Sequence, residues 1–246
     1  MPELPREERP AAAFVELADM LVRDYDVISF LHMLVDHCVD LLEVAAAGVL
    51  IATPQGQAVD IAASDERTRK LERLSSEWDE GPCRDCFHSG AQVPDVPLDT
   101  EAAAVRWPQF APTAVDAGFS SVAAAPLRLH EQVIGALNLF RDRPGALSAS
   151  ELRLGQALAD TATIGILHQR AMRDQMTVTA QLQHALDSRV VIEQAKGYLA
   201  HHRERGVDEA FTALRAYART HQMKLTEVAS NVLADTIDPT LLPPDD

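Results

Sequence analysis

The chain has 246 residues, 47% of them hydrophobic, and a formal net charge of −15 at pH 7. This length allows one large domain or two ordinary ones, and the apolar content supports a packed core, which excludes an intrinsically disordered chain. The negative charge disfavours non-specific binding to nucleic acid or anionic membranes, so a polyanionic partner must meet a locally basic face.

Export and membrane insertion are not indicated. The longest apolar run, at residues 44–52, is far too short to span a bilayer, and residues 1–10 lack the apolar core of a signal peptide. Three cysteines are an odd number for a disulfide framework. We therefore expect a cytoplasmic protein with a disordered N-terminus at residues 1–10.

Two predicted helices open the first domain. Apolar residues recur at helical spacing over residues 14–22 and again over residues 30–42, so each segment predicts a helix with one buried side. The first helix should begin near Ala11. His37 and Cys38 lie within the second pattern, which places them on a helix and not in a loop site.

Strands and further helices follow. Residues 46–63 hold two short apolar runs around a Pro-Gln-Gly turn, which is typical of two adjacent strands. Residues 65–78 favour a helix lying on a sheet, and residues 107–118 favour another after Pro108.

The remaining segments complete the predicted sheet. Residues 81–90 are rich in turn formers and predict a loop, while residues 92–99 hold too many prolines for a central strand. Residues 121–129 and 132–140 predict a β-hairpin. This order of elements predicts an α+β domain with an antiparallel sheet flanked by helices over residues 11–165.

A long helix should connect this domain to the C-terminal part. Ser148 or Ser150 can cap a helix that runs from Glu151 toward Arg205. A 4,3 spacing marks one seam along it: Met172, Met176, Thr179, Gln183, Leu186 and Val190. We expect residues 166–187 to form a helical linker that pairs with a second copy as a coiled coil. The alternative is a helix that packs on its own domain.

Residues 180–236 contain three short amphipathic patterns. The long helix should end at Gly206 as a left-handed stop, Asp208 should cap the next helix, and a third helix should begin at Leu225 or Thr226. Three small helices make little core alone, so the module should lean on the long helix and a dimer partner. Residues 237–246 are expected to form a flexible acidic tail.

This C-terminal module is locally basic. Residues 180–232 carry seven Lys and Arg against six Asp and Glu, whereas the rest of the chain carries a net charge of −16. A solvated helix face explains these charges too, because Glu193 can pair with both Arg189 and Lys196. Gly197 costs a helix about 1 kcal/mol relative to Ala. It indicates either tight helix packing or the close approach of a ligand backbone.

Residues 180–233 resemble an ANTAR domain, the three-helix RNA-binding output module of bacterial transcription antiterminators. The resemblance rests on an ordered string: Leu182, Ala185-Leu186, Ser188-Arg189, Ile192, Ala195-Lys196-Gly197, Ala210-Phe211, Leu214-Arg215, Ala218-Arg219 and Leu225. It implies binding to a pair of RNA stem-loops with hexanucleotide loops, which prevents formation of a terminator hairpin and lets transcription continue.

On this interpretation the RNA contacts fall on a few residues of the basic face. The candidates are Arg189, Lys196, Gly197, Arg215, Arg219 and Lys224. Arg can contact phosphates and unstacked bases by charge, hydrogen bonds and stacking, and Tyr198 or His221 could stack on a base. DNA binding by a helix-turn-helix fold is the structural alternative.

Residues 11–165 resemble a GAF domain, the small-ligand sensor fold commonly placed before ANTAR modules in actinobacteria. The motifs that carry it are GPCRDC from Gly81, WPQFAPTAVDAGFSSVAAAPLRL from Trp107 and VIGALNLF from Val133. The resemblance implies a small-molecule ligand of unknown identity, since GAF domains bind cyclic nucleotides, tetrapyrroles, haem or small acids, and some only dimerise.

Cys83 and Cys86, with His88 nearby, leave three interpretations open. They could form a redox pair on an exposed loop, supply two metal ligands, or line or cover a pocket. A second CxxC is absent from the sequence, so we expect no metal site. The alternative function is a GAF-type thiol enzyme that reduces free methionine sulfoxide.

These patterns and resemblances together predict a homodimeric regulator and not an enzyme. In this hypothesis a GAF sensor controls, through the long helix, an ANTAR module that binds paired stem-loops in nascent RNA.

Overall fold

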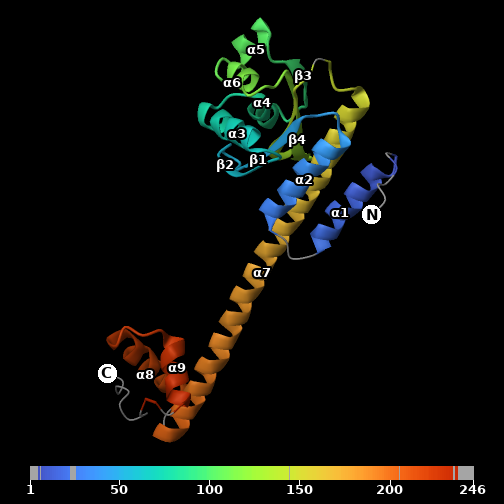
Figure 1. The fold of residues 1–246 in the computed structure, drawn as a ribbon. Helices are drawn as coiled ribbons and strands as arrows, with labels where there is room; N and C mark the ends of the chain where they lie inside the picture. The colour runs from blue at the N-terminus through green and yellow to red at the C-terminus, as the bar shows by residue number, and fades with distance from the viewer. Residues whose placement is uncertain are drawn as a thin grey trace. The chain divides into compact units, whose positions relative to one another are not determined.

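A five-stranded antiparallel sheet forms the centre of the N-terminal part in the computed structural model (Figure 1). Its strands are β1 (Ala46–Ala52), β2 (Ala58–Ala63), β3 (Val93–Pro97), β4 (Ser121–Leu129) and β5 (Gln132–Arg141). They lie in the order β2-β1-β5-β4-β3. The predicted hairpin is therefore β4–β5, and the proline-containing β3 lies at an edge, where missing backbone donors cost least.

The structure describes residue 5 and residues 7–22, 26–143, 145–204, 206–234 and 236–237. Half of the predicted disordered N-terminus (residues 1–4 and 6) and nearly all of the predicted acidic tail (residues 238–246) lie outside these ranges, whereas residues 9 and 10 belong to the first helix. The chain divides into two compact units, Met1–Arg170 and Ala171–Asp246.

The helices of the first unit flank the sheet. They are α1 (Arg9–Val22), α2 (Val27–Leu41), α3 (Glu66–Trp78), α4 (Pro82–Ser89), α5 (Glu101–Arg106), α6 (Phe110–Asp116) and the first part of α7 (Ala149–Arg203). Within the described ranges, none of the helices combines the length and the apolar character needed to cross a membrane.

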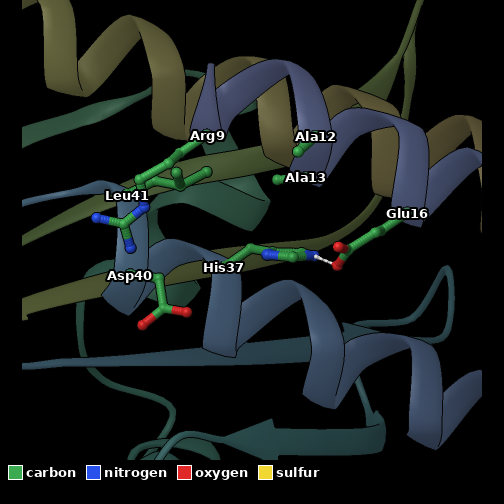
Figure 2. Close-up of a pocket in the computed structure, with 7 residues that line it drawn as sticks. All are labelled: Arg9, Ala12, Ala13, Glu16, His37, Asp40 and Leu41. Carbon is green, nitrogen blue, oxygen red and sulfur yellow. Dashed lines mark ion pairs between the residues drawn. The ribbon is translucent and has the colours of Figure 1, made fainter. Parts of the chain in front are cut away.

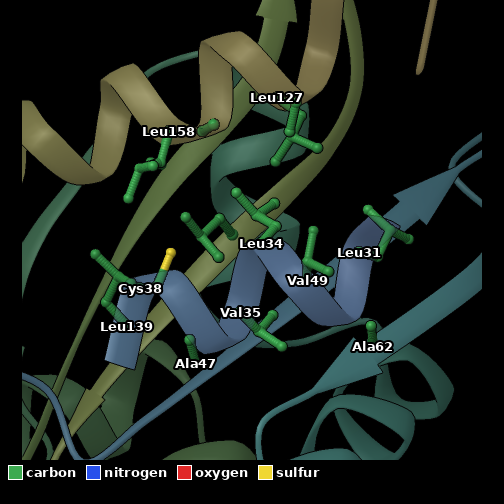
Figure 3. Packing of buried hydrophobic residues seen from close by; sticks show 14 of the residues in the cluster. Leu31, Leu34, Val35, Cys38, Ala47, Val49, Ala62, Leu127, Leu139 and Leu158 are labelled. Carbon is green, nitrogen blue, oxygen red and sulfur yellow. The ribbon is translucent and has the colours of Figure 1, made fainter. Parts of the chain in front are cut away.

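Each face of the sheet has its own core, because successive strand residues point to opposite faces. On one face, residues of α1, α2 and α7 pack on alternate strand residues such as Val49 and Leu127. Figure 3 shows the part of this core that α2 and α7 contribute. On the other face, residues of α3, α4 and α6 pack on the intervening residues such as Leu50 and Phe140. The first unit is thus a three-layer α/β/α arrangement within the predicted α+β class.

A reciprocal cap begins α7. The Ser148 Oγ accepts a hydrogen bond from the Glu151 backbone N–H at 3.2 Å, and the Glu151 carboxylate accepts one from the Ser148 N–H at 2.7 Å. This pairing satisfies two donors at the helix end, which explains why the long helix begins here as predicted.

One predicted loop is a helix. Residues 81–90 form α4, with Gly81 at its N-cap, Pro82 in its first turn and Gly90 at its left-handed C-cap. The turn formers mark the two ends of a short helix, in the arrangement that favours Pro at the start and Gly after the end. The exposed loop expected around Cys83 and Cys86 was therefore wrong.

The second unit contains the rest of α7 together with α8 (Val207–Thr220) and α9 (Leu225–Leu233), around a small core of residues such as Leu199, Leu214 and Val228. The chain turn before α8 differs from the prediction. Glu204 takes the left-handed conformation, whereas Gly206 has φ of −69° and is the N-cap of α8. Asp208 consequently lies inside the first turn of α8.

The predicted seam on α7 is open to solvent in the single chain. Met172, Met176, Leu186 and Val190 are 45–67% exposed. These four apolar side chains are not part of the buried core of the second unit.

Candidate functional site

Phe211 lies between two of the predicted basic residues in the second unit. The Lys196 Nζ, on α7, is 5.1 Å from the centre of the Phe211 ring, and the Arg215 Cζ, on α8, is 5.6 Å from it. The face of an aromatic ring attracts cations. One half-buried ring therefore holds a cation from each of two helices close together.

Lys196 is less available than the sequence suggests. Its Nζ lies 2.9 and 3.0 Å from the two carboxylate oxygens of Glu193, and its side chain is only 14% exposed. The predicted pair between Glu193 and Lys196 is thus present. Arg189 is exposed and forms no ion pair within the part of the chain that the structure describes. Its guanidinium group is therefore open to solvent.

Arg215 and Arg219 line one hollow of about 340 Å³. They lie one turn apart on α8, and the buried Ala218, the partly buried Met223 and the exposed Gln222 complete its wall together with Leu225. Guanidinium groups beside apolar surface can bind a phosphate and stack on a base at the same place. This hollow is the strongest candidate contact surface of the module.

Two other candidates, Lys224 and Gly197, are not among the residues that line this hollow. Lys224 is exposed at the N-cap position of α9. Gly197 is exposed, and a Cβ placed on it would meet no atom within 4 Å. Packing within the described residues therefore does not require this glycine.

The two aromatic candidates are already stacked on neighbouring histidines or tyrosines. Tyr198 lies 4.1 Å from His202 between ring centres, and His221 lies 3.9 Å from Tyr217. Each ring has one face engaged, so base stacking is confined to its other face.

Cys83 and Cys86 are buried on α4, in the core between that helix and the sheet. The Cys83 thiol donates a hydrogen bond to the Ala136 carbonyl oxygen at 3.5 Å. Burial, followed by the nearby Glu72, raises the pKa of Cys83 well above its usual value, and burial raises the pKa of Cys86 to about 12. Both thiols are protonated near neutral pH, whereas a reactive cysteine needs its thiolate.

Glu72 on α3 is a buried carboxyl that the sequence did not single out. Its Oε1 accepts a hydrogen bond from Asn138 Nδ2 at 2.8 Å. A Cβ on Gly48 would lie 2.5 Å from the same oxygen, so this glycine leaves room for the carboxyl. Burial raises the pKa of Glu72 to about 7, and hydrogen bonds with Asn138 and Cys83 offset part of that rise.

Two features of the site were missed by sequence reasoning. The apolar pattern of α8 predicts that Phe211 is core, and no pattern shows that two cations share its ring. Glu72 sits in a charged segment that was predicted as a helix lying on a sheet, and only the matching Gly48 and Asn138 on the neighbouring strands could have indicated that this carboxyl is buried. Among the described residues, no group of three or more His, Cys, Asp or Glu could hold a metal ion.

Both halves of the chain match family models. A model of the ANTAR domain matches residues 180–233, and a model of the GAF domain matches residues 25–167, which is more than half of the chain. No curated protein matches the chain significantly.

Solved structures resemble the first unit. The GAF domain of a phosphoenolpyruvate-protein phosphotransferase from Coxiella burnetii has a TM-score of 0.52 at 14% identity, covering 68% of this chain and 97% of that one. A domain of a protein named as a two-component sensor histidine kinase from Sinorhizobium meliloti has a TM-score of 0.51 at 16% identity, covering 62% and 99%. At such identities the likeness shows the fold alone.

A free methionine-R-sulfoxide reductase from Neisseria meningitidis, solved with its substrate, is also similar. It has a TM-score of 0.49 at 12% identity and covers 68% of this chain and 91% of that one. A score this low supports no argument about activity.

Proposed function

Because this chain belongs to the GAF family and joins its GAF domain to an ANTAR domain, we propose that it is a signal-responsive regulator that binds RNA through the ANTAR module and acts in transcription antitermination. The observation that carries RNA binding is the cation arrangement around Phe211 and the adjoining hollow lined by Arg215 and Arg219.

The proposed target is a pair of stem-loops in a nascent transcript, which places the protein in the cytoplasm. Single-stranded loops present phosphates and unstacked bases, and both suit a surface that combines guanidinium groups with apolar side chains. The contacts we propose are Arg189, Arg215, Arg219 and Lys224, with Gly197 allowing the RNA backbone to approach α7. We assign Lys196 a supporting role, because its ammonium is already held by Glu193.

A homodimer fits a target with two loops. We propose that the exposed seam on α7 pairs with the same seam of a second copy, since a coiled coil would cover its apolar side chains. Two weak contact surfaces on one dimer then bind two loops cooperatively, because the second contact forms at high effective concentration. The GAF domain would control this arrangement in response to a small molecule.

RNA titration tests the proposal. The full chain should bind a tandem hexaloop RNA, and a version with substituted loop bases should bind at least tenfold more weakly. Arg215→Ala and Arg219→Ala should each weaken binding by about tenfold to a hundredfold, as expected for contacts worth about 1–3 kcal/mol. Arg153→Ala removes a charge from an exposed position in the first unit and serves as the matched control.

Three results would contradict the proposal. These are equal affinity for both RNAs, unchanged affinity in both arginine variants, and displacement of the RNA by duplex DNA at matched salt. The last result would favour the helix-turn-helix alternative.

A further inference from the structure

A polar cavity lies between α1 and α2 of the first unit (Figure 2). It is separate from the core that holds Glu72, Cys83 and Cys86. Its volume is about 300 Å³, at the small end of the range for ligand pockets. Four of its residues come from one face of α1 and three from one face of α2. The positions repeat at three and four residues, as one helix face requires.

The walls combine small apolar side chains with four ionisable ones. Ala12 and Ala13 leave space on the α1 side. Arg9 and Asp40 line one end, and His37 and Glu16 line the other (Figure 2). Arg9, Glu16 and Asp40 are exposed, whereas the side chain of His37 is only 15% exposed, so the cavity opens to solvent on its charged side.

The charged groups are incompletely paired with one another. Within the described residues, neither Arg9 nor Asp40 forms an ion pair, although both line the same cavity. The His37 Nε2 lies 3.3 Å from the Glu16 Oε2, yet this buried nitrogen has no hydrogen bond of good geometry. The cavity therefore offers a cation, carboxylates and an imidazole nitrogen to a ligand.

We propose that this cavity binds a small zwitterion of the α-amino-acid class. The carboxylate of such a molecule would lie on the Arg9 guanidinium, and its ammonium group would lie on the Asp40 carboxylate at the same end of the cavity. A polyanion such as a nucleotide would meet two carboxylates here, and a simple cation would meet Arg9. Only a molecule that carries both charges satisfies both Arg9 and Asp40.

A ligand held here would join α1 to α2 beside the helix that leaves the domain. Leu21 of α1 packs against Gly165 of α7 so closely that a Cβ on that glycine would lie 2.3 Å from the leucine Cδ2. A change in the packing of α1 on α2 would therefore also change the packing of Leu21 against α7 within the same unit.

Calorimetric titration of the full chain without RNA tests this site. L-serine and L-leucine should bind, and the single-charge fragments acetate and methylammonium should bind at least tenfold more weakly. Arg9→Gln and Asp40→Asn should each weaken amino-acid binding at least tenfold. Asp36→Asn, at an exposed position on α2 outside the cavity, should leave it unchanged.

The site is refuted if neither amino acid binds at millimolar concentration, if acetate binds as tightly as L-serine, or if both cavity variants keep the native affinity while their melting temperatures show that they fold. Since no RNA is present, failure here leaves RNA binding by the ANTAR module untouched.

Discussion

Glu72 lies where deprotonation destabilises the folded state. Its folded pKa of about 7 is above its ordinary value of 4.5. The protonated Glu72 carboxyl therefore contributes fully to the stability of the folded state below about pH 4.5, and this contribution is lost as the pH rises through about 7. Between those limits the free energy of unfolding should fall by about 3 kcal/mol. Glu72→Gln should remove most of this pH dependence.

Denaturant melts at pH 5, 6, 7 and 8 measure this effect. Both tryptophans of the chain, Trp78 and Trp107, lie in the first unit, so their fluorescence reports its unfolding. Glu77→Gln, at an exposed position on the same helix, should keep the native pH dependence. Parallel pH profiles for the native chain and Glu72→Gln would show that the buried carboxyl is not the group involved.

A substitution at Gly197 should change the stability of the module and its affinity for RNA in opposite directions. Because a Cβ there meets nothing, Gly197→Ala should stabilise the module by about 1 kcal/mol through helix propensity. If the RNA backbone approaches this point, the same methyl group should weaken RNA affinity by about tenfold. Thermal melts followed by circular dichroism and RNA titration measure the two effects. Gln194→Ala, at an exposed position one turn away, should leave affinity unchanged, and undiminished affinity in Gly197→Ala would exclude the close approach.

Among the elements, α7 carries the clearest prediction about assembly. Leu186 lies on the apolar seam, whereas Val178 is an exposed apolar residue of the same helix that lies off it. Leu186→Lys should convert the expected dimer to a monomer, because it places a charge inside the coiled-coil contact. Val178→Lys should not. Sedimentation velocity distinguishes the two, and a monomeric native chain would refute the dimer itself.

The elements with strong periodicity were predictable, whereas the short helix α4 was not. The β4–β5 hairpin and α7 follow from alternation and from helical spacing over many residues. By contrast, α4 has only eight residues, too few to show a period, and it is held by packing of Cys83 and Cys86 on the sheet. Its sequence therefore reads as a loop, although Pro82 and Gly90 mark its ends.

For the candidate RNA contacts, too, the sequence predicts what depends on spacing along one helix and misses what depends on packing between helices. The spacing of Arg215 and Arg219 places both on one helix face, and the structure adds that they line one hollow. No spacing rule could show that Lys196 is occupied by Glu193 and Phe211, because this depends on how α8 packs against α7.

For the whole molecule, the distribution of charge predicts weak salt dependence. The chain carries −15 overall, and Lys196 is paired, so about four cations per module remain for phosphates. Log affinity should then fall with log salt concentration with a slope of about −3 per module. A titration series from low to physiological salt measures the slope. A value near −10 would indicate bulk attraction to the phosphate backbone and not recognition of a shaped loop.

Phe211 arranges part of the proposed RNA-binding surface before any RNA binds. Immobilising a long side chain at an interface costs about 0.5–1.5 kcal/mol of conformational entropy. By holding Lys196 and Arg215 against one ring, the folded module has already met part of this cost. A leucine at this position would fill similar space but would remove the aromatic partner of the Arg215 guanidinium, whereas Lys196 would keep its ion pair with Glu193. The aromatic ring at this position therefore preorganises the basic side chains around it.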